Sequence, residues 1–528
     1  MLRVLEECDN AAADFRPGPV HDLRVSLRRC RSLADGMMAM DPDRNWKAMK
    51  KAGRKLFRSL GALRDVQIMM EWIENLEFAN VARTPSSALP GLPSNCEGNR
   101  AVVSLEHPSD AAADALLQIL RERETEHKRQ ARTALQEFDR KQWRQWSTTL
   151  PQRAARIRPG SAVFRHLALE RWTAARHLHT RAMRTRSQVA LHTLRIGIKR
   201  FRYIVENFLP EEHKLWGKDL KHMQDLLGEV HDLDVLWATA LESRIFPDDF
   251  SRRRWDERIA HERTKRIEEY RSRTSGPESL WSVWRGGLPH AREIQQIATR
   301  RIKLWARRLD PDFAHSELVA KLALELHDGL HETGLLGRSR LPASDTEPTD
   351  ARESLYLAAL LHDVGKAKGN KRHQKHSLEL IESHGVPLGC KAETIRRAGL
   401  IARFHCGALP GRNHKDLQDL LNNERTLVIR LAAILRLANA LDAMHDAHVR
   451  RLRIENVKPA KRGNGFLRKP AHLAKNEALV IAAEGYDDGT RTAQAVAAER
   501  YLLETVLRRP VIVRPTSGSR ATTTGRRC

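Results

Sequence analysis

The chain has 528 residues, which is enough for two or more domains, and its composition is strongly basic. It contains 92 Lys and Arg against 66 Asp and Glu, and its sequence pI is near 10.3. This excess favours an anionic partner, either nucleic acid, an anionic membrane or inorganic polyphosphate. A membrane is disfavoured because no segment approaches the ~20 apolar residues of a spanning helix, and no apolar signal segment follows the first Met.

The cysteine pattern and the hydrophobic periodicity set the compartment and the fold class. Six cysteines stand at scattered positions without a CxxC pair, which is typical of free thiols in a reducing cytoplasm. Helical periodicity dominates the first 450 residues, so we expect a mainly α protein. Strand patterns occur late, at 478–485 and 510–515, on either side of a helix expected over 490–508.

The first expected elements include a basic helical segment that occurs twice, 171 positions apart. Each copy carries four basic residues at i, i+3, i+7 and i+10, a spacing that lines one face of a helix. Because like charges at this spacing destabilise an isolated helix, the repeated row indicates a polyanion lying along it. The basic rows are His21, Arg24, Arg28 and Arg31, then His192, Arg195, Lys199 and Arg202. The accompanying apolar stripes are Leu23, Leu27, Cys30 and Ala34, then Leu194, Ile198, Phe201 and Val205.

The duplication extends to a second helix after each row, now with an offset of 167. Gly61 matches Gly228 and Asp65 matches Asp232, in the phrases SLGALRDVQI and DLLGEVHDLDV. The repeating unit is therefore a helical hairpin that is basic along both arms, and two copies predict an approximate two-fold arrangement. The basic residues of the second arms are Lys47, Lys51, Arg54 and Lys55, then Lys214, Lys218, Lys221 and His222.

The duplicated HxxRxxxRxxR helices followed by LGxxxD resemble the CHAD domain, the conserved-histidine α-helical domain, over residues 1–288. This resemblance implies two pseudo-symmetric antiparallel helical bundles whose basic surface binds inorganic polyphosphate. The composition agrees, because polyphosphate needs Lys and Arg but no stacking platforms. Binders of single-stranded nucleic acid interleave aromatic residues with basic ones, whereas aromatic residues make up 5% of this chain. We therefore disfavour nucleic acid as the partner.

The second half carries a different pattern, centred on LYLAALLHDVGK, where His362 and Asp363 end an apolar helix. Adjacent imidazole and carboxylate groups bind one divalent metal when the helix end directs both inward. His-Asp pairs also occur elsewhere in the chain, so the surrounding series distinguishes this one. Such groups, spread over four helices, converge in the core of a bundle as a mono- or dinuclear site. The series comprises His315, His373, His376, His405, Asn439, Asp442, His445 and Asp446.

This series resembles the HD superfamily of metal-dependent phosphohydrolases. More particularly, residues 300–515 resemble the C-terminal domain of the exopolyphosphatase/guanosine pentaphosphatase family. The matching stretches include HSELVAKLALELHD, HQKHSLELI, IARFHCGALP and LAAILRLANALD. The resemblance implies metal-assisted attack of water on phosphorus, with Mn, Mg or Fe as the metal. It gives catalytic roles to His362 and Asp363, and phosphate contacts to Lys366 and Arg403. The implied metal ligands are His315, His362, Asp363, His376 and His405.

Two departures from the family pattern bear on activity. The closing ligand of the family is usually the Asp of an Ala-Asp pair, and here that position is Asn439, a weaker ligand for a hard ion. Asp442 lies three residues further on the same helix face and is the candidate substitute. The parent enzymes also carry an actin-like catalytic module with phosphate-binding loops. Nothing in this chain resembles that module, so any catalysis must come from the HD site alone.

The predicted organisation is a CHAD domain over 1–288, with repeats at about 1–150 and 160–288, and an all-α HD domain with a small C-terminal α+β part over 291–515. Residues 516–528 are expected to be disordered. Three functions stay open. The first is a polyphosphate-binding protein whose HD domain hydrolyses polyphosphate or phosphorylated nucleotides, in the cytoplasm and at polyphosphate granules. The second is a non-catalytic polyphosphate scaffold with a degraded HD site, and the third is nucleic-acid binding.

Overall fold

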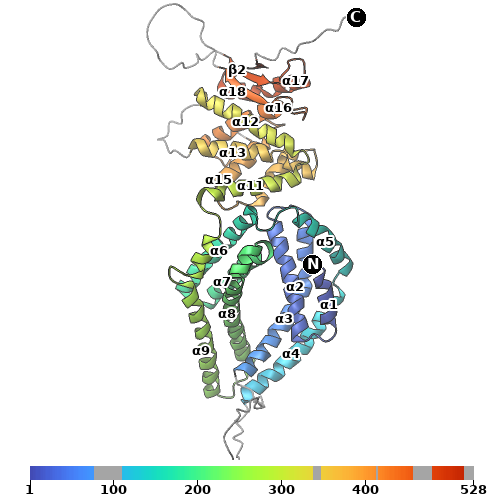
Figure 1. The fold of residues 1–528 in the computed structure, drawn as a ribbon, viewed down its shortest axis with the longest axis vertical. Helices are drawn as coiled ribbons and strands as arrows, with labels where there is room; N and C mark the ends of the chain where they lie inside the picture. Colours follow the sequence, from blue (N-terminus) through green and yellow to red (C-terminus); the bar gives the residue numbers. More distant parts are fainter. Residues whose placement is uncertain (77–109, 337–346, 412–413, 456–477, 517–528) are drawn as a thin grey trace, which may run out of the picture. The chain divides into compact units, whose positions relative to one another are not determined.

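The computed structural model describes residues 1–76, 110–336, 347–411, 414–455 and 478–516 (Figure 1). It is mainly helical, as the periodicity predicted. The chain divides into two compact units, the first comprising Met1–Met38 and Asp43–His290, the second Ala39–Pro42 and Ala291–Cys528. No helix in the described part is long and apolar enough to cross a bilayer. The predicted disordered tail lies outside the described residues, except for residue 516.

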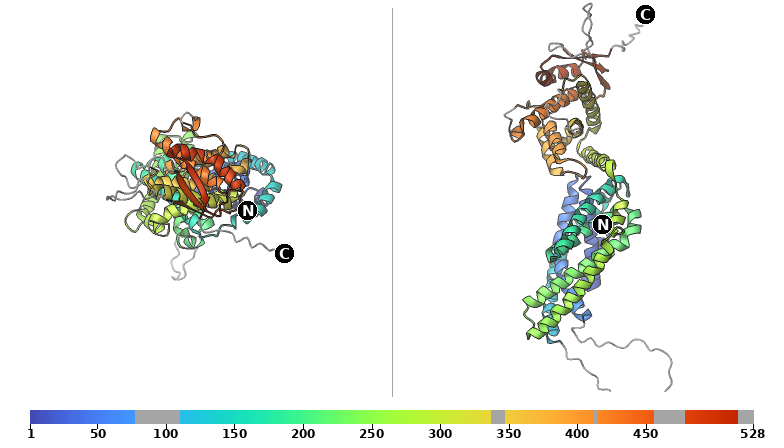
Figure 2. Two further views of the ribbon diagram at one scale, coloured as in Figure 1. Left: turned by 90° about the horizontal axis from the view of Figure 1, so that it is seen from above. Right: turned by 90° about the vertical axis from the view of Figure 1, so that its left-hand side faces the viewer.

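The first unit consists of two similar sets of helices (Figures 1 and 2). In the first set α1 packs on α2, α2 on α3 and α3 on α4, and in the second set α6, α7, α8 and α9 pack in the same order. This correspondence confirms two pseudo-symmetric bundles. The helices are α1 (Arg3–Ala12), α2 (Pro17–Met37), α3 (Arg44–Asn75), α4 (Ala111–Gln136), α5 (Arg140–Ala154), α6 (Ala162–Thr185), α7 (Gln188–Phe208), α8 (Pro210–Glu242), α9 (Asp249–Thr274) and α10 (Leu280–Gly286).

The two repeats contact each other in two places. Helix α2 meets α7 so closely that a Cβ atom on Gly36 would lie 2.3 Å from the Phe208 ring. Helices α3 and α8 also pack together, and their C-terminal halves share an apolar cluster with α4 and α9 that includes Ile73, Leu236 and Trp255. These contacts bury apolar area from both repeats, which makes them one unit.

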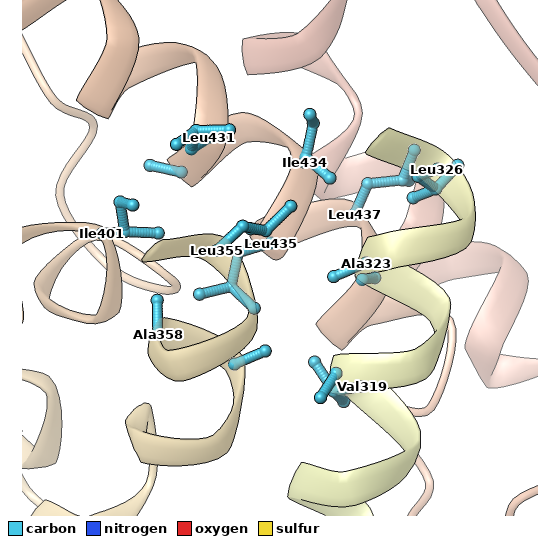
Figure 3. Close-up of a cluster of buried hydrophobic side chains, with 14 of the residues drawn as sticks. Val319, Ala323, Leu326, Leu355, Ala358, Ile401, Leu431, Ile434, Leu435 and Leu437 are labelled. Atoms are coloured by element: carbon cyan, nitrogen blue, oxygen red, sulfur yellow. The ribbon is translucent and has the colours of Figure 1, made fainter. Parts of the chain in front are cut away.

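The second unit is a helical bundle with a small sheet. Its elements are α11 (Ala291–Leu309), α12 (Phe313–Glu332), α13 (Glu347–Leu361), η1 (Val364–Lys368), α14 (His373–His384), α15 (Ala392–Arg403), η2 (Lys415–Leu417), α16 (Asn422–Ala440), β1 (Arg451–Glu455), β2 (Leu479–Glu484), α17 (Arg491–Glu499), α18 (Tyr501–Leu507) and β3 (Val511–Pro515). Side chains from α12, α13, α15 and α16 form its core, where Val319, Leu355, Ile401 and Leu435 interlock (Figure 3).

The sheet has the order β1-β2-β3, with β1 antiparallel and β3 parallel to β2. Both late strands predicted from the sequence are therefore confirmed, as β2 and β3. The helix between them begins at the Thr490 cap, as expected, but is divided at Arg500 into α17 and α18. Strand β1 was not predicted, although its segment RLRIE alternates charged and apolar residues.

Candidate anion-binding face and metal centre

The apolar stripes beside the basic rows are confirmed as core. Every residue of both stripes is buried, with Cys30 the most exposed at 4%. The rows flank this core: Arg24, Arg28 and Arg31 are half-buried, and all four row residues of α7 are half-buried, while His21 is exposed. Cationic heads are thus held beside apolar surface, where water screens their charge less than at an open surface.

Contacts between α2 and α7 bring the two rows together. Arg28 Nη1 donates a hydrogen bond to the hydroxyl of Tyr203 (2.9 Å), and Arg29 Nε donates to Glu206 Oε1 (2.8 Å). The amide of Asn207 donates to Ser32 Oγ at 3.2 Å. Two segments about 170 residues apart in sequence therefore form one basic face.

The electrostatics of the face show a concentration of positive charge. Burial, together with Arg28, Arg195 and Arg24, lowers the pKa of Lys199 to about 7. Burial also lowers the pKa of Arg24 to about 10, with Asp65 opposing and Arg28 adding to the shift. Within the described residues, three buried row nitrogens have no hydrogen-bond partner, namely Arg24 Nη1, Arg28 Nε and Arg202 Nε.

The repeated Gly and Asp of the second arms lie against these rows. A Cβ atom on Gly61 would lie 2.8 Å from Arg24 Nη1, and one on Gly228 would lie 3.8 Å from Arg195 Nε. Each glycine therefore lets the arginine of its own repeat lie close to the helix backbone. Asp232 lies among these charges, where burial and the neighbouring Asp65 raise its pKa to about 6 against the opposing effect of Arg195.

The second arms are more exposed than the rows and partly neutralised. All seven of their Lys and Arg residues are exposed, and His222 is half-buried. Lys55 pairs with Glu137, Lys214 Nζ lies 3.0 Å from Glu211, and His222 Nε2 lies 2.7 Å from Glu269 Oε1. The strongest field for an anion is therefore expected between the rows of α2 and α7 rather than along α3 and α8.

The second unit brings His315, His362 and Asp363 together. One candidate ligand atom from each lies within 4.8 Å of the other two, and all three side chains are buried. His362 and Asp363 follow the end of α13, and His315 lies in the first turn of α12, which Asp312 caps by accepting a hydrogen bond from the His315 amide (3.4 Å). The apolar packing of α12 on α13 sets their separation.

The position of His362 suits a metal ligand. Its Nδ1 donates to the backbone carbonyl of Ala359 at 2.7 Å, which leaves Nε2 with a free lone pair. Within the described residues this Nε2 is buried without a hydrogen-bond partner. Burial lowers the pKa of His362, which favours the neutral form that ligates metals.

Asp363 lies among cationic and imidazole groups. Its Oδ2 is 3.4 Å from His362 Nε2 and accepts a hydrogen bond from Lys366 Nζ at 2.5 Å, while its Oδ1 is 3.3 Å from His373 Nε2. Burial alone would raise the pKa of Asp363, but His362, His373, His405 and Lys366 together hold it below its ordinary value. Asp363 is therefore a carboxylate at neutral pH.

His315 is held by the two residues of α16 and its C-terminal turn that the sequence singled out. Its Nδ1 donates to Asp442 Oδ2 (2.7 Å), and its Nε2 donates to Asn439 Oδ1 (2.9 Å). Burial would lower the pKa of His315, but these two hydrogen bonds raise it. The other oxygen of Asp442 accepts the Ala447 amide (3.0 Å), so both oxygens of Asp442 are engaged in fixing His315 and the turn.

Three further residues that the sequence predicted for the site have different surroundings. His405 is buried beside Asp363, with Nε2 3.7 Å from its Oδ1. Arg403 is also buried, but its Nε donates to Asp416 at 3.0 Å. His376 belongs to neither group of converging donor atoms in the described part of the chain, although its Nδ1 is buried without a partner.

Two residues that the sequence reasoning left out of the ligand set lie in the site. His373 contacts Asp363 and His405, and Cys406 lies beside His373 with Sγ 3.7 Å from its Nε2. Gly365 explains the position of His373, because a Cβ atom there would lie 2.0 Å from the His373 carbonyl oxygen. The glycine of HDVGK was the available sequence signal: it allows the start of α14 to approach the His-Asp pair.

Comparison with known families gives two separate matches, one in each half of the chain. Residues 1–241 match the model of the CHAD domain, and residues 297–483 match that of the Ppx/GppA phosphatase, domain III. No curated protein sequence matches the chain. The protein therefore joins a CHAD domain to a domain of the Ppx/GppA phosphatase domain III type, a combination that fits a role related to polyphosphate.

Proposed function

We propose that the protein binds inorganic polyphosphate between the basic rows of α2 and α7. The observation that carries this proposal is the set of buried, unpartnered nitrogens in the rows, on Arg24, Arg28 and Arg202. A buried donor without a partner costs about 1–3 kcal/mol. A phosphate chain supplies closely spaced anionic oxygens, so it satisfies such donors and compensates the charge at the same time.

The aromatic residues of this face support a base-free ligand. The ring of Phe57 lies under two guanidinium groups, with centroid distances of 5.2 Å to Arg24 and 4.7 Å to Arg31. Tyr203 is largely buried and its hydroxyl accepts a hydrogen bond from Arg28. These rings orient arginine side chains instead of offering open platforms on which nucleic-acid bases stack.

Binding is tested by removing charge from the face and from elsewhere in equal amounts. The face variant carries Arg24→Gln, Arg28→Gln, Arg195→Gln and Lys199→Gln. The control carries Arg181→Gln, Arg253→Gln, Arg271→Gln and Lys141→Gln, all at exposed positions outside the rows and second arms. Titration with polyphosphate should show a loss of at least about 100-fold for the face variant, since each charge-assisted hydrogen bond contributes about 1.5–3 kcal/mol. Equal affinities of the two variants would reject the proposal.

We further propose that the second unit is a metal-dependent phosphohydrolase acting on polyphosphate or on phosphorylated nucleotides. The donor set fits a divalent metal: His315, His362 and Asp363 converge, and the buried Nε2 of His362 lacks a partner among the described residues. A divalent metal held there would lower the pKa of a coordinated water and neutralise charge on the phosphoryl group. His315 would need to release its Nε2 proton to join this set.

The chain's own residues prepare the site for that chemistry. Asp363 supplies the negative charge, and the buried walls of α12, α13 and α16 limit the access of bulk water. Lys366 is half-buried with its ammonium on Asp363, so it can move to a phosphate oxygen only by leaving that carboxylate. Arg403 is already paired with Asp416, so its support of phosphate is weaker than the resemblance implied.

Catalysis is tested by one assay on the full-length protein. With Mn²⁺ or Mg²⁺ we expect release of phosphate from polyphosphate or from a phosphorylated nucleotide. The double variant His362→Ala, Asp363→Ala should bind polyphosphate normally and lose this turnover. Turnover that persists in the double variant would place the chemistry elsewhere.

A second candidate function is a non-catalytic polyphosphate scaffold, and Asn439 is the observation that favours it. The amide oxygen of Asn439 accepts a hydrogen bond from His315 Nε2, where a carboxylate would add negative charge for a metal. In this case the protein binds polyphosphate in the test above, but elemental analysis finds no metal and neither substrate class is hydrolysed. In both cases we expect it in the cytoplasm, at polyphosphate granules.

A further inference from the structure

The first turn of α12 and the turn that follows α16 exchange two hydrogen bonds between histidine and aspartate. His315 Nδ1 donates to Asp442 Oδ2 at 2.7 Å, and His445 Nδ1 donates to Asp312 Oδ2, also at 2.7 Å. Each segment supplies one histidine and one carboxylate, so the contact is reciprocal. The sequence analysis included His445 in the histidine series but gave it no role.

The two imidazole rings of this exchange stack on each other. Their centroids lie 3.8 Å apart, and their planes differ by 21°. At this distance the rings are in van der Waals contact, so His445 covers one face of His315. The side chain of His315 is only 2% exposed, whereas His445 lies at the surface. His445 therefore separates His315 from solvent on this side.

The stack matters most when His315 ligates a metal. Its Nδ1 is bonded to the Asp442 carboxylate, so Nε2 is the nitrogen that can become a ligand. To do so, Nε2 must give up its hydrogen bond to Asn439 Oδ1. The ring is then fixed only by Asp442 at one edge and by His445 on one face.

The backbone of the turn is held in an unfavourable conformation that places His445 over His315. His445 and Ala447 are both in the left-handed region, with φ of 56° and 54°. The Asp442 carbonyl accepts the His445 amide at 3.0 Å, and Asp442 Oδ1 accepts the Ala447 amide at 3.0 Å. Such strain, imposed by several surrounding contacts, is typical of functional sites.

We infer that His445, held by Asp312, is a positioning residue that fixes the ring of His315 for metal binding and shields it from solvent. His445 acts through His315 and is not itself a ligand. Its effect on metal affinity rests on the proposed metal centre, whereas its contact with His315 does not. The two parts can therefore be measured separately.

The contact is tested on metal-free, full-length protein by the rate at which diethyl pyrocarbonate modifies His315, followed by peptide mass spectrometry. We expect modification to be several-fold faster in His445→Ala than in the wild type. His445→Phe should restore protection, because it keeps a ring that stacks on His315. The matched control is His448→Ala, which removes an exposed histidine of the same turn and should leave the rate unchanged.

Positioning is tested by isothermal titration of the same proteins with Mn²⁺. The affinity should fall by about 10-fold or more in His445→Ala, the loss typical of a residue that orients a histidine ligand. It should stay close to the wild-type value in His445→Phe and in His448→Ala. Rescue by phenylalanine separates positioning from a direct metal contact, because phenylalanine has no ligand atom.

The inference is rejected if His445→Ala protects His315 as well as His448→Ala does, or if His445→Phe is as reactive as His445→Ala. Unchanged Mn²⁺ affinity in His445→Ala would likewise reject the positioning role. The metal centre is judged separately. Protein that shows the expected modification rates but binds no Mn²⁺ keeps the contact between His445 and His315 and loses the metal centre, and with it the phosphohydrolase.

Discussion

A Cβ atom on Gly61 would lie 2.8 Å from Nη1 of Arg24, so the guanidinium group of this row residue rests directly against helix α3. The equivalent distance in the second repeat, from Gly228 to Arg195 Nε, is 3.8 Å. The same glycine in both repeats thus serves the same purpose, but the first repeat is packed more tightly. Alanine substitutions at Gly61 and Gly228 therefore form a matched pair, in which only the first crowds the arginine.

We expect Gly61→Ala to weaken polyphosphate binding and Gly228→Ala to leave it nearly unchanged. The added methyl group must displace the flexible end of Arg24, while Arg195 has room. Neither change should reduce stability, because alanine favours a helix over glycine by about 1 kcal/mol. Polyphosphate titration and thermal unfolding check this together. Loss of stability in Gly61→Ala would show that the backbone moves instead of Arg24.

Polyphosphate binding should weaken as pH rises above neutrality, and Lys199 should be the cause. Burial holds its pKa at about 7 in the free protein, and a bound polyanion favours its charged form. The gain in affinity is therefore complete below pH 7 and is lost as pH rises through the higher pKa of the complex. Lys199→Arg should flatten this dependence, because arginine stays charged.

The measurement is a polyphosphate titration at several pH values from about 7 to about 9, where Asp232, with a pKa of about 6, is already mostly ionised. His231 does not interfere, because burial lowers its pKa to about 4 and it is neutral throughout. Calorimetry in two buffers should also detect proton uptake on binding near pH 8 in the wild type, and less in Lys199→Arg. Identical pH profiles for both proteins would exclude Lys199 as the titrating group.

Asp442 acts through His315, and its removal should reduce metal binding. Its Oδ2 fixes His315 Nδ1 at 2.7 Å, and both side chains are almost fully buried. We expect Asp442→Asn to lower divalent-metal affinity by about 10- to 100-fold, as typical for a residue that orients a histidine ligand. Asp446→Asn, in the same turn but exposed, is the control. Equal metal affinities of the two variants would assign Asp442 a purely structural role.

Asn439→Asp should strengthen the metal centre. The substitution places a carboxylate 2.9 Å from His315 Nε2, where the amide oxygen now lies, with almost no change in volume. We expect divalent-metal affinity to rise by about tenfold, or about 1.4 kcal/mol. Isothermal titration with Mn²⁺ measures this gain. Phosphate release that appears only in the variant would favour the scaffold function for the natural protein, whereas unchanged affinity would place Asn439 outside the metal environment.

The local patterns of the first unit translated directly into structure. The i, i+3, i+7, i+10 spacing with its apolar stripe predicts a basic row beside the core of a packed helix, and both stripes are buried. Duplication predicted two bundles. Spacing carries no information about which helices of the two repeats meet, so the contact between Arg28 and Tyr203 was not predictable. Asp65 and Asp232 place negative charge within this basic face. Their effect on the basic residues follows from the packing of the two rows, which the spacing does not give.

The candidate metal centre likewise combines local sequence features with features that only the packing decides. The His-Asp pair at the end of an apolar helix is a local feature, and the resemblance to the HD superfamily implied His315, His362, Asp363 and His405 as ligands. It proposed His376 as a ligand, whereas the structure brings His373 to Asp363. The choice between two histidines three residues apart depends on how α14 begins, which Arg372 and Gly365 decide through backbone conformation and close approach.

The sequence by itself therefore determined the helices, the duplication, the basic rows and the inventory of donor residues, because periodicity and residue type are local properties of the chain. Only the tertiary structure decided which rows share one face, which histidine reaches Asp363, and that Cys406 lies beside His373. The physical reason is that screened charge interactions extend about 10 Å and metal ligation about 2 Å in space, whatever the separation along the chain. The packing of α2 on α7, and of α14 against the turn after α13, sets those distances.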